Sequence, residues 1–396
     1  MTLLDHCPVC ESDSVEEFLR RDSVPVHQNL LLESAVAAKN LRRGDLAMTV
    51  CRDCGFVFNA AFDPKRLDYG SAYENTQTHS PAFADYVNDL VEHLVRERDV
   101  KNCRIVEIGC GKGGFLTKLV EPPEHGNQGF GYDPSYLGPE TLYDGRLEFR
   151  RQFYDARCRD LQADAVICRH VIEHIESPVS LLRAVQGALQ DSPRAKIFFE
   201  TPCVDWILQH QVVWDFFYEH CSLFTPRSLT TAFERAGLAV VGCRHVFGGQ
   251  YLWLEAQPAA GPTPVRRDAG ATCHLARRFA IEESRRQTEW MDLLAASRRR
   301  GPVALWGAGA KGVTFANLLD PRGELMDCVV DVNPAKQGKF LAGTGHPIVR
   351  PEDLLARRVQ SVIVLNPNYV AEVRQWLIET APRMEVIDLM ERKRAA

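Results

Sequence analysis

The chain has 396 residues, which predicts two or three compact units because domains of about 150 residues are typical. Its 45% hydrophobic and 25% charged residues are typical of a globular protein, and its net charge of −5 excludes a general attraction to nucleic acid or to an anionic membrane. No apolar stretch approaches a length of about 20 residues, which a membrane span needs, and residues 1–10 lack the order of a secretory signal. We therefore expect a cytoplasmic protein with no membrane or nucleic-acid partner.

Two Cys-x-x-Cys pairs mark the N-terminal part, Cys7 with Cys10 and Cys51 with Cys54. This spacing lets a tight turn aim both sulfurs at one ion, and four sulfurs complete a closed tetrahedral zinc shell. We expect residues 1–68 to form a zinc-binding domain in which the metal stabilises folding. A coincidental pairing or a redox pair is the alternative, although a redox motif needs only one pair. The nine other cysteines are scattered singly, as is typical of reduced thiols.

Residues 69–258 alternate strand-like apolar runs with helical patterns, which predicts a parallel sheet with helices on both faces. The expected strands are 104–108, 129–132, 165–168, 196–200 and 238–246. This plan is that of a Rossmann-like α/β domain.

The first of these strands runs into a glycine-rich turn with Gly109, Gly111 and Gly113 at the start of a helix. Glycines let the backbone approach a ligand closely there, but Gly109, Gly111 and Gly114 also satisfy the dinucleotide fingerprint G-x-G-x-x-G. Glu107 favours S-adenosylmethionine (SAM), because a carboxylate can hold the cationic amino group of the methionine part and would repel a pyrophosphate. Asp133 ends the next strand and can accept both ribose hydroxyls, which fits SAM and NAD equally.

The pattern further along the chain favours SAM again. Residues 164–175 give a strand, a polar loop and then Glu-His, which is similar to the fourth motif of class I methyltransferases. We therefore expect the central unit to be a class I methyltransferase domain. Tyr154, Asp155 and His170 join the residues that we expect at the SAM site.

Residues 214–225 are dense in aromatic and ionisable side chains. One interpretation is a hydrophobic cluster with a hydrogen-bonded histidine, which is common in cores. The other is a catalytic patch, in which His220 beside Glu219 is a general base tuned near neutral pH. His174, after the fourth strand, and Tyr73, in a polar stretch before the sheet, are weaker candidates for the same site.

The C-terminal part predicts a second, smaller Rossmann-like α/β unit. A Pro- and Gly-rich stretch at 258–266 indicates a linker, and a polar helix follows at about 270–300, so we assign 259–300 to linker and helix. Residues 301–396 form the second unit, with strands expected at 303–306, 328–331 and 361–366.

A second glycine loop opens this unit, with Gly307, Gly309 and Gly312, and Asp331 follows at the dinucleotide spacing. This pattern is consistent with a second cofactor site. The loop can also help to hold the nucleotide end of a substrate, or be purely architectural. Lys336 and Lys339 could meet a diphosphate, or be ordinary surface lysines.

The order of these parts resembles the zinc-containing sugar C-methyltransferases, which methylate C3 of thymidine-diphosphate-linked 4-keto deoxysugars. The resemblance covers most of the chain and rests on both cysteine pairs with Gly55, on residues 107–113, and on the C-terminal motifs at 306–312, 331–340 and 343–344. It implies SAM and structural zinc as cofactors. It implies a small-molecule substrate, either a nucleotide-linked sugar or a related natural-product intermediate.

The family's central motif is Tyr-x-Glu-His followed by Ser and an aromatic residue, and this chain matches it at Glu219, His220, Ser222 and Phe224. Phe217 stands in the place of the Tyr, and Tyr218 one step later is the substitute that we consider. The absent phenol leaves the acceptor open, and O- or N-methylation of another small molecule remains an alternative.

The resemblance also implies a mechanism. His220, oriented or made more basic by Glu219, removes a proton next to a ketone, and the resulting carbanion attacks the methyl group. His174 and Tyr73 are the donors that stabilise the enolate oxygen. Two other functions stay open: an NAD-dependent oxidoreductase that uses one or both glycine loops, and a non-catalytic module whose zinc knuckles bind a partner.

Overall fold

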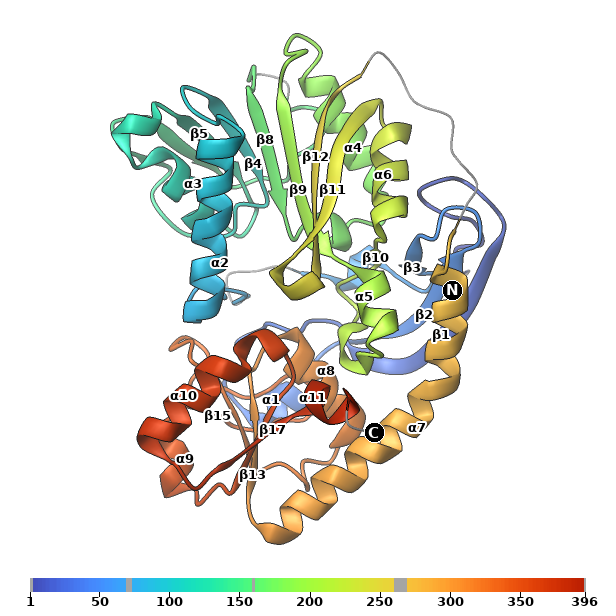
Figure 1. Ribbon diagram of the computed structural model, residues 1–396, viewed down its shortest axis with the longest axis vertical. Helices are drawn as coiled ribbons and strands as arrows, with labels where there is room; N and C mark the ends of the chain where they lie inside the picture. Colours follow the sequence, from blue (N-terminus) through green and yellow to red (C-terminus); the bar gives the residue numbers. More distant parts are fainter. Residues whose placement is uncertain (1–2, 69–72, 159–160, 260–268, 395–396) are drawn as a thin grey trace.

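A computed structural model describes residues 3–68, 73–158, 161–259 and 269–394 of the chain (Figure 1). Most of the linker expected at 258–266 lies outside these ranges. Three sheets organise the described residues: one N-terminal, one central and one C-terminal.

The N-terminal sheet is antiparallel and has the order β1-β2-β3-β10. Its strands are β1 (Val15–Pro25), β2 (Arg43–Cys51), β3 (Val57–Asn59) and β10 (Ser222–Leu223), and the short helix α1 (Ala35–Lys39) lies between β1 and β2. Gly55 turns the chain between β2 and β3 with a φ of 75°, a conformation that favours glycine. Since β10 comes from the central part of the chain, this sheet holds the segment that directly follows His220.

The central sheet has eight strands in the order β11-β12-β9-β8-β4-β5-β7-β6. They are β4 (Arg104–Ile108), β5 (Gln128–Tyr132), β6 (Thr141–Leu142), β7 (Leu147–Arg150), β8 (Ala165–Arg169), β9 (Lys196–Pro202), β11 (Leu238–Val246) and β12 (Tyr251–Pro258). All five predicted strands are confirmed. The strand β12 runs antiparallel to both β9 and β11 in an otherwise mostly parallel sheet. At the opposite edge, the short strand β6 runs antiparallel to β7. A Rossmann-like sheet with the reversed strand β12 is the class I methyltransferase arrangement.

Helices cover both faces of the central sheet because neighbouring residues of its strands face opposite cores. Ile105 packs in one core with helices α2 (Pro81–Glu92) and α3 (Gly114–Val120). Val106 packs in the other core, to which α4 (Pro178–Ala188) and α6 (Pro226–Arg235) contribute. A further short helix, α5 (Val204–Gln209), follows β9.

The C-terminal unit is a five-stranded parallel sheet in the order β15-β14-β13-β16-β17. Its strands are β13 (Val303–Trp306), β14 (Cys328–Val330), β15 (Ile348–Val349), β16 (Ser361–Val364) and β17 (Glu385–Asp388). Its helices are α8 (Ala310–Leu319), α9 (Asp353–Ala356), α10 (Val370–Thr380) and α11 (Leu389–Arg394). The long helix α7 (Thr272–Arg300) confirms the predicted polar helix and runs beside the N-terminal sheet to this unit (Figure 1).

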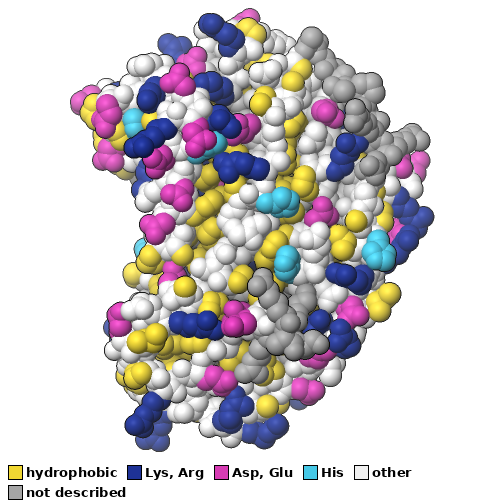
Figure 2. Space-filling model, viewed as in Figure 1, with side chains coloured by type: hydrophobic (Ala, Val, Ile, Leu, Met, Phe, Trp, Pro, Cys, Tyr) yellow, Lys and Arg dark blue, Asp and Glu magenta, His cyan; other side chains and the backbone are white. Residues whose placement is uncertain are grey.

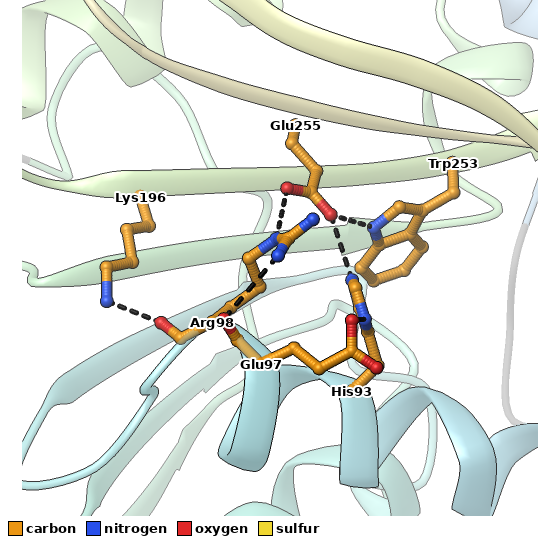
Figure 3. A network of polar contacts seen from close by, with 6 residues as sticks. All are labelled: His93, Glu97, Arg98, Lys196, Trp253 and Glu255. Atoms are coloured by element: carbon orange, nitrogen blue, oxygen red, sulfur yellow. Dashed lines mark hydrogen bonds and ion pairs between the residues drawn. The ribbon is translucent and has the colours of Figure 1, made fainter.

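A polar network fastens the end of α2 to the central sheet (Figure 3). The Glu255 carboxylate lies 2.9 Å from His93 Nε2 and accepts from Trp253 Nε1 at 3.1 Å. It also accepts from Arg98 Nε at 2.5 Å, and Lys196 donates to the carbonyl of Arg98. None of these residues lines the cavity described below, so we assign the network to stability.

Acidic and basic side chains are interspersed over the face of the molecule that Figure 2 shows, without a large patch of one sign. This agrees with the modest net charge of −5. None of the helices in the described ranges combines the length and the apolar character that a bilayer span requires.

Candidate active site

The first glycine loop joins β4 to α3 and leaves space for a ligand. Gly109 and Gly113 have φ angles of 69° and 78°, and a Cβ atom there would lie 2.1 Å from Val171 and 2.3 Å from Phe149, respectively. Gly111 has a φ of 54°, and its missing Cβ would meet no atom within 4 Å. The loop therefore needs glycine for its conformation, and it is open at Gly111.

Glu107, at the end of β4, is buried with a relative exposure of 3%. Burial raises the pKa of Glu107 to about 7, against the lowering effect of the Arg169 charge. One of its carboxylate oxygens has no hydrogen-bond partner among the described residues. A buried carboxylate with an unused oxygen fits the cationic amino group of SAM, because a partner of that charge satisfies the oxygen and stabilises the ionised form.

Asp133 clamps the same loop. Its carboxylate accepts from the backbone N–H of Gly111 at 2.8 Å and from the backbone N–H of Ser135 at 2.8 Å. The Ser135 hydroxyl donates to the same carboxylate oxygen as the Ser135 N–H, at 2.6 Å. Among the described residues, the other oxygen accepts only from Gly111, so its second lone pair can accept from a ribose hydroxyl.

The other residues expected at the SAM site lie in different surroundings. Tyr154 packs edge-to-face on Tyr132, with ring centroids 5.2 Å apart, and Asp155 pairs with Arg157 at the surface. His170 follows β8 with a φ of 55° and lines the cavity described next, rather than the glycine loop.

A cavity of about 260 Å³ lies between the carboxyl ends of the central strands and the C-terminal unit. Its wall includes His220, Glu219, His174, Tyr73 and His170 of the residues predicted from the sequence. The second glycine loop forms the opposite part of the wall, from Gly307 to Gly312.

His220 and His174 face each other in this cavity, with ring centroids 4.8 Å apart and ring planes at 89°. Burial lowers the pKa of His220 well below its usual value, and the positive charges of His170 and Lys311 lower it further. Burial also lowers the pKa of His174. Both imidazoles are therefore neutral at pH 7, and a neutral imidazole can accept a proton. The expectation that His220 is tuned near neutral pH is wrong, because its burial makes the imidazole a weaker base.

Burial raises the pKa of Glu219 to about 7, against hydrogen bonds from the backbone of Gln28 and the phenol of Tyr73. The Gln28 N–H donates to its carboxylate at 2.8 Å. Glu219 thus interacts with the N-terminal part of the chain and, within the described ranges, forms no hydrogen bond with the ring of His220.

The structure places Phe217, and not Tyr218, in the cavity wall. Phe217 packs on His220 with ring centroids 4.1 Å apart. The Tyr218 hydroxyl accepts from the backbone N–H of Asp63 at 2.9 Å, and its ring is fully buried beside Phe62. Residues 217–220 form a turn, in which the His220 N–H donates to the Phe217 carbonyl at 3.2 Å. The two neighbouring side chains lie in different surroundings, so Tyr218 does not take the place of a phenol in the cavity.

His170 lies between two buried carboxylates, 3.3 Å from Glu173 and 3.3 Å from Glu200. Burial opposes its protonation, but both carboxylates favour it and raise the pKa of His170 to about 9. The cavity therefore holds one cationic histidine next to two neutral ones.

The second glycine loop repeats the first in outline. Its φ at Gly307 is 102°, and a Cβ at Gly312 would lie 2.0 Å from the Gly307 carbonyl oxygen, so only glycine fits. Asp331 accepts from the Ala308 N–H at 2.8 Å. Lys311 in the loop pairs with Asp215 of the central unit.

Lys336 is buried in the wall of this cavity, with a relative exposure of 6%. Its ammonium donates to the Asn29 side-chain oxygen and to the Ala308 carbonyl, both at 3.1 Å. Burial lowers the pKa of Lys336, with Asp331 and Glu74 opposing. Because both hydrogen-bond acceptors are neutral, this cation still favours an anionic partner. Lys339, by contrast, pairs with Glu33 near the surface.

The four cysteines predicted as ligands come together. Cys7 Sγ lies 3.7 Å from Cys54 Sγ, and Cys10 Sγ lies 3.5 Å from Cys51 Sγ. The four sulfurs lie within 4.8 Å of one another and could hold a metal ion, as could the group of Glu173, His174 and His220. All four are reduced thiols, as are the single cysteines.

Asn29 lines the cavity and gave no signal in the sequence. Asp215 and Asn333 also line it, and they lie within the segments 214–225 and 331–340 that the sequence marks, but neither was given a role there. The three residues reach the cavity from three separate parts of the chain.

Two family models match the chain. The first, a methyltransferase domain, matches residues 77–242, and the second, the C-terminal domain of C-methyltransferases, matches residues 268–383. The C-methyltransferase NovU of Streptomyces niveus is 26% identical and covers 93% of this chain and 91% of its own length. The ubiquinone biosynthesis O-methyltransferase of Aeromonas salmonicida is 26% identical over 45% of this chain and 76% of its own length.

Among solved structures, the chain is similar to the 1,6-didemethyltoxoflavin-N1-methyltransferase of Burkholderia thailandensis, with a TM-score of 0.35 and 13% identity over 45% of this chain and 81% of that one. It is also similar to the magnesium protoporphyrin IX methyltransferase of Synechocystis PCC 6803, with a TM-score of 0.34 and 16% identity over 45% of this chain and 84% of that one.

Proposed function

Since the chain is a SAM-dependent methyltransferase, we propose that it methylates a carbon next to a ketone, on a nucleotide-linked sugar or a related natural-product intermediate. The juxtaposition of two neutral histidines with a buried lysine in one cavity carries this proposal. The NovU similarity and the match to the C-terminal domain of C-methyltransferases support transfer to carbon.

The first glycine loop is the proposed SAM site. Glu107 would hold the amino group, the turn from Gly109 to Gly113 would approach the methionine part, and Asp133 would accept from the ribose. When bound, SAM supplies a methyl group on a positively charged sulfur and leaves as S-adenosylhomocysteine (SAH), which keeps the electron pair of the broken C–S bond.

His220 is the proposed base. Its neutral imidazole takes the proton from the carbon next to the ketone, and the electron pair of that C–H bond becomes the enolate that forms the new C–C bond. A positioned base of this kind contributes about 10²- to 10⁴-fold to the rate. The N–H of His174 and the phenol of Tyr73 line the same cavity and are the proposed donors to the enolate oxygen.

Glu219 acts on His220 indirectly in this proposal. Its carboxylate accepts from the Gln28 N–H, which anchors the side chain directly before His220 to the N-terminal part of the chain. On the other side of His220, the Cys221 carbonyl accepts from Asn59 N–H at 2.9 Å. The base is thus held by its neighbours in sequence, which limits the orientations that its ring can adopt.

The acceptor has an anionic part in this proposal because Lys336 offers a buried positive charge with neutral partners. The second glycine loop beside it contributes backbone N–H groups at the start of α8, which suits a phosphate group. A diphosphate placed there would leave a linked sugar to extend toward His220. Phe217 gives that end of the cavity an apolar wall in place of a phenol.

We also propose a structural zinc ion at Cys7, Cys10, Cys51 and Cys54. The sulfur–sulfur distances of 3.5 and 3.7 Å fit a tetrahedral site, for which a Zn–S length of about 2.3 Å implies a spacing of about 3.8 Å. The pair Cys51 and Cys54 lies at the turn between β2 and β3, and β3 pairs with β10 directly after His220. The metal would therefore stabilise the sheet that positions the base.

Mass spectrometry with methyl-labelled SAM tests the proposed reaction. A panel of nucleotide-linked keto sugars should include one that gains a single labelled methyl group, and NMR should place it on the carbon beside the ketone. A methyl group on oxygen or nitrogen would contradict carbon transfer, and the absence of a product from every nucleotide-linked sugar would contradict the substrate class.

Elemental analysis tests the zinc proposal. We expect one zinc ion per chain, and Cys54→Ser should lose it and unfold at a lower temperature. Cys243→Ser is the matched control, because Cys243 is a single free cysteine in β11. This variant should leave the zinc content unchanged. Equal zinc content in both variants would contradict the site.

A further inference from the structure

Glu74 is a buried carboxylate outside the proposed chemistry, and it contacts three distant parts of the chain. Its relative exposure is 4%. One of its carboxylate oxygens pairs with the ammonium of Lys112, in the first glycine loop. The other accepts from the side chain of Asn333, in the C-terminal unit, at 3.1 Å. Its backbone N–H donates to the carbonyl of Asn29 at 2.8 Å, in the N-terminal part.

The charge of Glu74 is maintained by these contacts. Burial favours the neutral acid, but hydrogen bonds from Lys112 and from the backbone of Thr76 outweigh it and lower the pKa of Glu74 to about 2. A buried ionised carboxylate is stable only while its partners stay in place, since losing one partner leaves an uncompensated charge. Moving Lys112 or Asn333 away would therefore leave the buried Glu74 charge with fewer partners, which is unfavourable.

The segment that begins with Glu74 also forms part of the acceptor cavity. Tyr73 and Thr76, on either side of it, line the wall. Further along, the Ser80 hydroxyl donates to Glu372 in α10 of the C-terminal unit at 2.7 Å. The wall is thus attached to the C-terminal unit at two points, Asn333 and Glu372, and to the glycine loop at Lys112.

We propose that Glu74 is a positioning residue that couples the SAM-binding loop to the acceptor cavity. A ligand that orders the loop fixes Lys112, which fixes Glu74, and Glu74 then holds Asn333 and the adjacent Tyr73 in place. The acceptor wall is completed when the methyl donor is present, so both reactants are held together and water is excluded. The inference rests on the SAM site assigned above to the first glycine loop.

Hydrogen–deuterium exchange with and without SAH tests this coupling without requiring turnover. In the wild type, SAH should slow exchange by about threefold or more in peptides that cover residues 109–116, and also in those that cover 328–337, because binding at one site orders the linked segment. In Glu74→Gln, the slowing should remain at 109–116 and disappear at 328–337.

Two further variants make the result specific. Lys112→Met breaks the other end of the link at a side chain that is half exposed and, like Glu74→Gln, it should lose the effect at 328–337. Glu33→Gln is the matched control, because Glu33 also joins the N-terminal part to the C-terminal unit, through Lys339, without contacting the glycine loop. It should behave as the wild type does.

Slowing confined to 109–116 in the wild type would overturn the coupling and leave the SAM site intact. Slowing at 328–337 that persists in both Glu74→Gln and Lys112→Met would overturn the role of Glu74. Absence of any slowing at 109–116 would overturn the SAM-site assignment and this inference with it.

Discussion

The two glycine loops of this chain have the same backbone clamp. Asp133 accepts from an N–H of the first loop and from the N–H two residues after itself, both at 2.8 Å. Asp331 does the same in the second loop, with Ala308 and Asn333, again both at 2.8 Å. A carboxylate at the end of the second strand is therefore a structural part of both loops, and its presence does not identify a ligand.

The loops differ in the residue two positions before the first glycine. The first has Glu107, a buried carboxylate with an unused oxygen, and the second has Leu305, a fully buried apolar residue. They also differ in their surroundings, since the second loop lines the cavity that contains His220 and Lys336. The glycine spacing is common to both loops, and the acid and the neighbouring side chains distinguish their proposed ligands.

Of the substitutions that test this difference between the loops, Glu107→Gln should have the largest effect, on SAH affinity. Loss of a charge-assisted hydrogen bond to the amino group should weaken SAH binding by about 100-fold, as measured by calorimetry. Thermal stability at pH 8 should stay equal or rise, because the variant removes a buried charge that burial disfavours. Unchanged SAH affinity would remove the basis for placing SAM at the first loop.

Lys336→Met tests the second loop. Without the buried ammonium, the KM for a nucleotide-linked sugar should rise by about 30-fold, while SAH affinity stays the same. Lys339→Met provides the control, since that lysine pairs with Glu33 near the surface. If the Lys339 variant showed the larger effect, the anion would bind elsewhere.

Matched substitutions of the two clamp residues, Asp133 and Asp331, should have smaller effects, each on a different ligand. Asp133→Asn should weaken SAH binding by about tenfold and leave the acceptor KM unchanged, because it removes one charged acceptor at the first loop. Asp331→Asn should raise the acceptor KM and leave SAH affinity unchanged. Loss of SAH affinity in both variants would mean that the two loops are not separate sites.

The pH dependence of SAH binding should show the smallest effect. Free Glu107 is protonated below its raised pKa of about 7, and a bound ammonium group favours the carboxylate. SAH affinity should therefore fall as the pH drops, by about eightfold between pH 7.5 and pH 6.0, with proton release on binding below pH 7. Calorimetry in buffers of different ionisation enthalpy measures the released proton, and Glu107→Gln should abolish both effects.

The regular part of the fold was predictable from the sequence, because buried parallel strands such as 104–108 and 165–168 form continuous apolar runs. The strand β12 (Tyr251–Pro258) was missed because its apolar run leads directly into the predicted linker at 258–266. It pairs antiparallel with β11, the strand just before it in the chain. The strands of the N-terminal sheet were not predicted one by one, although β2 has a largely apolar run at 46–51, because residues 1–68 were assigned as a whole to a zinc-binding domain.

The site was predictable where local sequence determines geometry. Glu107 and the glycine turn form one strand–helix connection, and each cysteine pair forms one turn. Lys336 was indistinguishable from a surface lysine, because its burial depends on Asn29, which is 307 positions away in the sequence. The choice between Phe217 and Tyr218 depends on the direction in which an irregular segment points its side chains, and the structure places Phe217 in the cavity.

Deuterium exchange into the acceptor tests most directly that His220 removes a proton from carbon. A thymidine-diphosphate-linked 4-keto deoxysugar should be incubated in D₂O with SAH and enzyme, and NMR should follow the position next to the ketone. The wild type should exchange this hydrogen, and His220→Asn should do so at least about 100-fold more slowly while it binds SAH normally. Exchange at an equal rate in His220→Asn, or none in the wild type, would contradict the account.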